Sequence, residues 1–61
     1  MNTLTYDIAK ERGSSRYYAH HVDTPKVPVP GSFGDKKKAL HVAADSMGLD
    51  YKDYMALRRK Q

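Results

Sequence analysis

The sequence predicts a small α+β domain, in which a three-stranded antiparallel sheet, or a hairpin with an extended arm, packs on one main helix. Three observations predict this class. Apolar residues alternate with polar ones over residues 4–9, which is the period of a half-buried strand. Apolar residues recur at helical spacing over residues 35–47. The 61 residues suffice for one domain, 1–61. On folding, a chain of this length buries only about 60% of the surface that it exposes when unfolded, so its core is thin.

Two strands and an arm are predicted before residue 35. Residues 4–9 and 17–22 form a hairpin that turns around Gly13, and residues 23–26 form a second turn. Residues 26–30 contain two prolines, which lack the backbone N–H that a central strand donates, so this segment is an edge strand or an extended arm. The inner face of the sheet is predicted to carry Leu4, Tyr6, Ile8, Val27, Val29 and Phe33.

Two helices are predicted after residue 34. Asp35 can cap the first helix, 35–47, and Gly48 can end it in the left-handed conformation that glycine adopts at little cost. Asp50 can cap a short C-terminal helix, 50–59, whose basic last turn complements the negative end of the helix dipole. The apolar residues of the two helices are Leu40, Ala43, Ala44 and Met47, and then Tyr51, Tyr54, Met55 and Leu57.

An all-α helix-turn-helix is the alternative fold. Residues 6–22 resemble the helix-turn-helix of lac-type repressors, because small, turning, capping and apolar residues fall where that motif has them. These residues are Ala9, Gly13, Ser15, Ala19 and Val22. A second match covers residues 43–57 around Gly48, but its recognition helix would begin with Asp50 and Asp53, which phosphates repel.

Residues 16–48 resemble the strand-strand-helix type of nucleic-acid-binding domain. The junction at residues 31–40 (GSFGDKKKAL), followed by Ala43 and Ala44, is similar to the one in double-stranded-RNA-binding domains, and also to the one in integrase arms and AP2 domains. The resemblance implies that lysines at the helix start grip phosphates. The overall outline also resembles small phage inhibitors of host RNA polymerase, which implies a protein partner instead.

Basic residues are the candidates for binding. The net charge is +4, and three adjacent lysines open the helix at 35–47. The first turn of a helix already carries partial positive charge, so each like charge there costs about 0.3–1 kcal/mol of stability. A chain that accepts this cost can use the charges to hold an anion such as phosphate. The predicted nucleic-acid-binding residues are Lys36, Lys37, Lys38, Arg16, Tyr17, Arg58, Arg59 and Lys60.

Tyr17 and Tyr18 are adjacent on a predicted strand and therefore point to opposite faces of the sheet. One ring is expected at the surface, where it could stack on a base beside Arg16, and the other in the core. A platform for single strands would need a second exposed aromatic residue on the same face.

Catalysis is not expected. The sequence has no nucleophile turn and no glycine-rich phosphate loop, and a chain of this length has little room for an enclosed pocket. His20, His21 and His41 lack the spacing of a metal site. The absence of cysteine fits a reducing cytoplasm, and no apolar run predicts a membrane segment. We therefore predict a non-catalytic accessory protein, of phage or mobile-element type, with no cofactor, no metal, no membrane and no small-molecule substrate.

Two kinds of partner fit a basic patch. The first prediction is a nucleic acid, DNA or RNA, held by its backbone at the basic helix start. The alternative is a protein-binding regulator or inhibitor that docks on an acidic surface of a host enzyme such as RNA polymerase.

Overall fold

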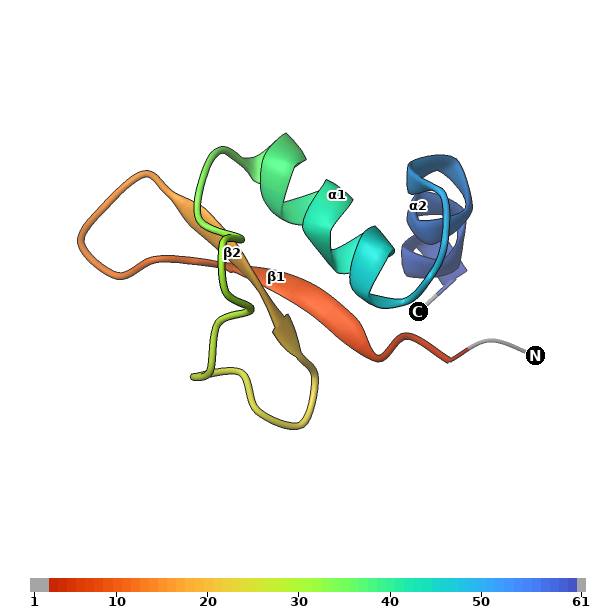
Figure 1. Ribbon diagram of the computed structural model, residues 1–61, viewed down its shortest axis with the longest axis horizontal. Helices are drawn as coiled ribbons and strands as arrows, with labels where there is room; N and C mark the ends of the chain where they lie inside the picture. The colour runs from red at the N-terminus through yellow and green to blue at the C-terminus, as the bar shows by residue number, and fades with distance from the viewer. Residues whose placement is uncertain (1–2, 61) are drawn as a thin grey trace.

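The computed structural model describes residues 3–60. Its elements follow one another as β1 (Tyr6–Lys10), β2 (Tyr17–His21), α1 (Lys36–Ser46) and α2 (Tyr51–Lys60). The two strands form an antiparallel hairpin, α1 packs on both strands, and α2 packs on α1 (Figure 1). The predicted α+β class is confirmed. The all-α alternative is wrong, because the segments that it assigns to helices pair with each other as strands.

The register of the hairpin decides which side chains face α1. The pairs run from Tyr6 opposite His21 to Lys10 opposite Tyr17, and directly opposed residues share a face. Ala19 is fully buried in the core with α1, so the inner face carries the side chains with the same parity. These inner residues are Tyr6, Ile8, Lys10, Tyr17, Ala19 and His21; the outer ones are Asp7, Ala9, Tyr18 and His20.

The third segment is an arm and not a third strand. It touches β2 at two separate bridges, where Gly34 pairs with Tyr17 and Pro28 pairs with His20. Gly34 and Tyr17 exchange two backbone hydrogen bonds of 2.7 and 3.0 Å, and the Val29 N–H donates to the Ala19 carbonyl (2.8 Å). The residues between the two bridges bulge out of register. Of the two forms predicted for this segment, the two isolated bridges show that the extended arm is the correct one.

Both ends of α1 follow local sequence signals. The Asp35 carboxylate accepts the Lys38 N–H (2.8 Å), which makes Asp35 the N-cap. At the other end, Gly48 adopts a φ of 70°, and its N–H donates to the Asp45 carbonyl (2.9 Å). The Leu49 N–H then donates to the Ala44 carbonyl (2.9 Å), which completes a Schellman motif. The predicted helix bounds are correct to within one residue.

The core lies between the inner face of the hairpin and the two helices. Its buried residues are Ala19, Leu40, Ala43, Ala44 and Tyr54, and partly buried side chains such as Ile8, Val29 and Met47 surround them. Two predicted members are wrong. Val27 lies in the turn that follows β2 and is 62% exposed. Phe33 contacts Tyr18 on the outer face, because the bulge of the arm reverses the predicted alternation.

Candidate nucleic-acid interface

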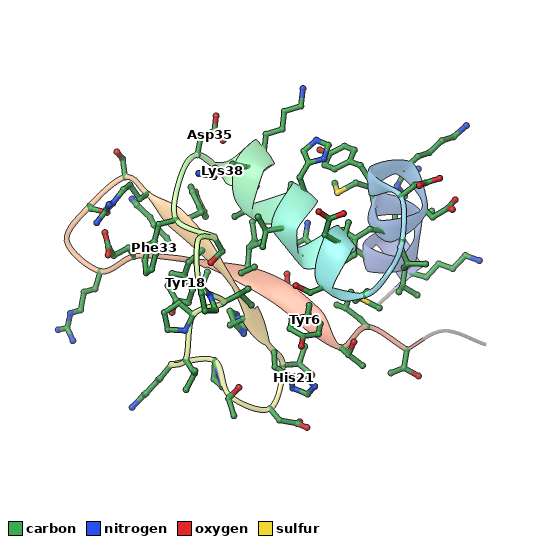
Figure 2. The ribbon with its side chains drawn as sticks, in the orientation of Figure 1. Tyr6, Tyr18, His21, Phe33, Asp35 and Lys38 are labelled. Atoms are coloured by element: carbon green, nitrogen blue, oxygen red, sulfur yellow. The ribbon has the colours of Figure 1, made fainter. Side chains whose placement is uncertain are left out.

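The three lysines form the first turn of α1, and all are exposed. Successive helical residues are about 100° apart, so the three side chains fan over more than half of the helix circumference. The carboxylate of Asp35 is turned toward the Lys38 N–H (Figure 2), and no ion pair between residues 3 and 60 involves any of the three ammonium groups. The positive charge of this turn is therefore available to a partner.

Lys38 lies beside Tyr17, although 21 positions separate them in the chain. A Cβ atom added to Gly34 would stand 2.6 Å from Cδ of Lys38, so the aliphatic part of Lys38 fills the place of the missing side chain. Gly34 is directly opposite Tyr17, and opposed residues share a face. Lys10 is the partner of Tyr17 on the other strand. Lys10, Tyr17 and Lys38 thus form one row across the sheet.

The sequence reasoning missed Lys10. Its alternation with Tyr6 and Ile8 could have placed it on the inner face, but the predicted strand ended at residue 9. Tyr17 and Tyr18 do point to opposite faces, as predicted. Both are half-buried and neither belongs to the core, so the prediction that one ring fills the core is wrong.

Arg16 belongs to the other face and is already paired. Its guanidinium donates to the Glu11 carboxylate from Nη2 (2.7 Å) and Nε (3.0 Å). The hydrogen bond from Ser14, followed by the one from Arg16, holds the pKa of Glu11 below its usual value. Cζ of Arg16 also lies 5.4 Å from the ring centre of Phe33. Arg16 therefore lies on the opposite face of the sheet from Tyr17 and Lys38, and Glu11 neutralises part of its charge.

Arg58 ties α2 to the free edge of β1. Its guanidinium reaches the Asp7 carboxylate at 3.1 and 3.2 Å, and the same oxygen of Asp7 accepts the Ile8 N–H (2.7 Å). The neighbouring Tyr6 carbonyl accepts the hydroxyl of Tyr54 (2.7 Å). Both backbone groups point away from β2, because the hydrogen bonds to β2 come from the odd-numbered residues of β1. These side chains therefore satisfy two backbone groups of the strand edge that faces away from β2.

The pKa of Tyr54 is raised to about 12, chiefly by burial and in smaller part by the nearby charge of Asp7, while the charge of Arg58 opposes the rise. The hydroxyl therefore stays protonated at neutral pH and remains a hydrogen-bond donor. Arg59 and Lys60 are exposed at the end of α2, beyond Arg58. Arg58 is anchored to Asp7, which lies about 10 Å along β1 from Lys10, so these three basic residues do not join the lysine turn.

The structure gathers the excess charge of the chain at one end. The start of β2 and the segment that leads into α1 meet there, because the Tyr17–Gly34 hydrogen bonds join them, and the hairpin loop extends beyond this point (Figure 1, left). We call this region the basic end. Its charged residues are Lys10, Glu11, Arg12, Arg16, Asp35, Lys36, Lys37 and Lys38. The basic end contains six basic and two acidic residues, and the rest of the chain contains five of each. The whole net charge of +4 therefore lies at the basic end.

Other kinds of site find less support among the described residues. No three histidine or acidic side chains in residues 3–60 stand together to hold a metal ion. A shallow hollow of about 590 Å³ lies in the curve of the hairpin loop, and residues 10–15 alone line it. No helix in this part of the chain has the length and apolarity to cross a bilayer.

Comparison of the chain with protein-family models, with curated proteins and with solved structures finds no match. The resemblance of residues 16–48 to strand-strand-helix domains therefore stays a prediction. The resemblance of residues 6–22 to a repressor helix-turn-helix is wrong, because these residues form a β-hairpin. Residues 43–57 do span two helices around Gly48, but α2 has Asp53 in its first turn, which disfavours it as a reader of DNA.

Proposed function

We propose that this chain is a small non-catalytic accessory protein, of the kind that phages and mobile elements encode, and that it binds the backbone of a nucleic acid in the cytoplasm. The observation that supports the proposal best is the placement of charge: the whole net charge of +4 lies at the basic end. A surface of this kind attracts a polyanion and releases its counterions on binding.

The start of α1 supplies the phosphate contacts in this proposal. Lys36, Lys37 and Lys38 offer mobile ammonium groups, and the N–H groups of the first helical turn lack intrahelical acceptors. Asp35 takes the N–H of Lys38 and leaves those of Lys36 and Lys37. Tyr17 adds a phenol beside Lys38, and Lys10 extends the charge onto β1. Arg58 has a structural role, and Arg59 and Lys60 add charge at a distance from the site.

The salt dependence of binding tests the proposal. The logarithm of affinity for a duplex should fall with the logarithm of salt concentration, with a slope of about −0.9 for each phosphate neutralised. Replacement of Lys36, Lys37 and Lys38 by Gln should weaken binding to all sequences alike. It should also make the slope shallower by up to about 0.9 for each of the three lysines. The fold should persist, because the helix start loses unfavourable charge.

A matched control removes the same charge from the far end. Lys52, Arg59 and Lys60 are also exposed and form no ion pair within residues 3–60, so their replacement by Gln should change the slope far less. Equal effects of the two triple variants would refute the proposed site. If the unaltered protein binds neither DNA nor RNA at low salt, the proposal fails, and docking on an acidic protein surface becomes the better explanation.

A further inference from the structure

The outer face of the hairpin carries a cluster of aromatic rings that the core does not use. Phe33 of the arm lies 5.4 Å from Tyr18 of β2, measured between ring centres, at an angle of 40°. Tyr18 lies 5.8 Å from His20, and Cζ of Arg16 stands over the Phe33 ring at 5.4 Å. Figure 2 shows Tyr18 and Phe33 side by side. We call Arg16, Tyr18 and Phe33 the ring cluster.

Each member of the ring cluster is held in place by a separate contact. The hydroxyl of Tyr18 donates to the Pro25 carbonyl (3.0 Å), and Glu11 holds Arg16. Phe33 precedes Gly34, whose backbone is fixed on β2. His20 is only 7% exposed, whereas Tyr18 and Phe33 are half-buried and Arg16 is exposed. The rings are therefore partly accessible and already ordered, so a ligand that stacks on them does not have to order them.

The ring cluster is close to the lysine turn along the chain, although the rings lie on the outer face of the hairpin and α1 packs on the inner face. Phe33 lies three positions before Lys36, which limits the distance between their Cα atoms to about 10 Å. A guanidinium over a flat ring, with ammonium groups a few residues away that form no ion pair within residues 3–60, provides the groups that a nucleotide needs, since it joins a flat base to a phosphate. Helix α1 and the core lie on the opposite face of the hairpin, so the rings are not needed to fill the core.

We infer that Tyr18 and Phe33 stack on unpaired bases of a single strand whose phosphates lie along Lys36, Lys37 and Lys38. This inference rests on the proposed function and specifies its ligand as a single-stranded nucleic acid. In a duplex the faces of the bases are covered by their neighbours, so a duplex engages the lysines without the rings. Single strands therefore gain affinity from stacking that duplexes do not.

A tryptophan reporter tests this stacking directly. The chain contains no tryptophan, so Phe33→Trp introduces a single indole at the proposed contact and keeps an aromatic ring there. Addition of a ten-nucleotide oligo-dT or oligo-rU should quench its fluorescence, whereas a duplex of the same length should quench it little. The control is Val22→Trp, at an exposed position just beyond the end of β2 and about 13 Å from Tyr18 along the chain, where neither the oligonucleotide nor the duplex should quench.

Affinity measurements separate this inference from the proposed function. Tyr18→Leu and Phe33→Leu should each weaken single-strand binding about tenfold and leave duplex binding within twofold, with folding checked by thermal melting. Quenching of the Phe33→Trp protein by either DNA or RNA strands supports the inference. Strong duplex binding with no quenching by either strand overturns it but leaves the proposed function standing. Failure to bind any nucleic acid at low salt overturns both.

Discussion

The hydroxyl of Tyr54 offers a sharp test of how α2 is attached to the sheet. Tyr54 is fully buried, and its hydroxyl donates to the Tyr6 carbonyl at the free edge of β1 (2.7 Å). Tyr54→Phe keeps the ring and its packing but leaves that carbonyl without its partner. One lost hydrogen bond is worth about 1 kcal/mol, and a buried unpaired carbonyl can cost up to about 3 kcal/mol.

Because the Tyr6 carbonyl is only partly covered, we expect a loss of about 1–2 kcal/mol in the free energy of unfolding. In a domain of this size, each kcal/mol lowers the melting temperature by about 4–8 °C. Urea unfolding followed by far-UV circular dichroism measures the change, with the slope of the free energy against urea expected to stay constant.

Tyr51→Phe is the matched control for this experiment. The Tyr51 ring stacks on His41 at 4.1 Å between centres, and its hydroxyl makes no hydrogen bond within residues 3–60. Its removal should change stability by less than about 0.5 kcal/mol. If Tyr54→Phe is as stable as the parent protein to within about 0.3 kcal/mol, the hydrogen bond does not hold α2 to β1 and the reasoning is refuted.

Three further outcomes follow from the same structure. Leu40→Ala should cost about 2–5 kcal/mol because Leu40 is 4% exposed at the centre of α1, and a melting temperature within a few degrees of the parent would contradict this. Asp35→Ala should cost about 0.5–2 kcal/mol of stability through loss of the N-cap. It should also strengthen binding to a polyanion, since a carboxylate leaves the basic end; weaker binding to an oligonucleotide would count against that site. The folded-state pKa of Tyr54 is raised, so its contribution to stability is complete below pH 10 and is lost as pH rises toward 12; chemical unfolding should show a smaller loss in Tyr54→Phe.

Local signals in the sequence were sufficient for the helices and the hairpin. Asp35 and Gly48 carry the capping chemistry of α1 within a few residues of the ends that they define, and Gly13 adopts the positive φ (80°) expected of its turn. The arm was harder to predict. Val27 lies in a turn and Phe33 follows a bulge. Both features change which face of the sheet the next side chains point to, and the sequence of the arm does not show where either feature occurs.

The candidate site divides in the same way. The lysine turn is contiguous in sequence and was found there, as was the opposite orientation of Tyr17 and Tyr18. The packing of Lys38 beside Tyr17 depends on the pairing of Gly34 with β2, which only the fold reveals. The second aromatic ring on the outer face is Phe33, which is half-buried like Tyr18 and which the sequence assigns to the core.

The predicted roles of two arginines could not be judged from the sequence. Arg58 pairs with Asp7 across 51 positions, so no local pattern could show that it closes the edge of β1. Arg16 pairs with Glu11 across the hairpin, and this contact depends on the length of the loop between them.

Chemical-shift mapping tests the central claim, that the basic end binds nucleic acid, most directly. Uniformly ¹⁵N-labelled protein would be titrated at low salt with a ten-nucleotide single strand and, separately, with a duplex. We expect the largest amide shifts in residues 10–18 and 33–39, with residues 55–60 almost unchanged. Shifts centred on α2, or none at the lysine turn while the nucleic acid is bound, would contradict the claim.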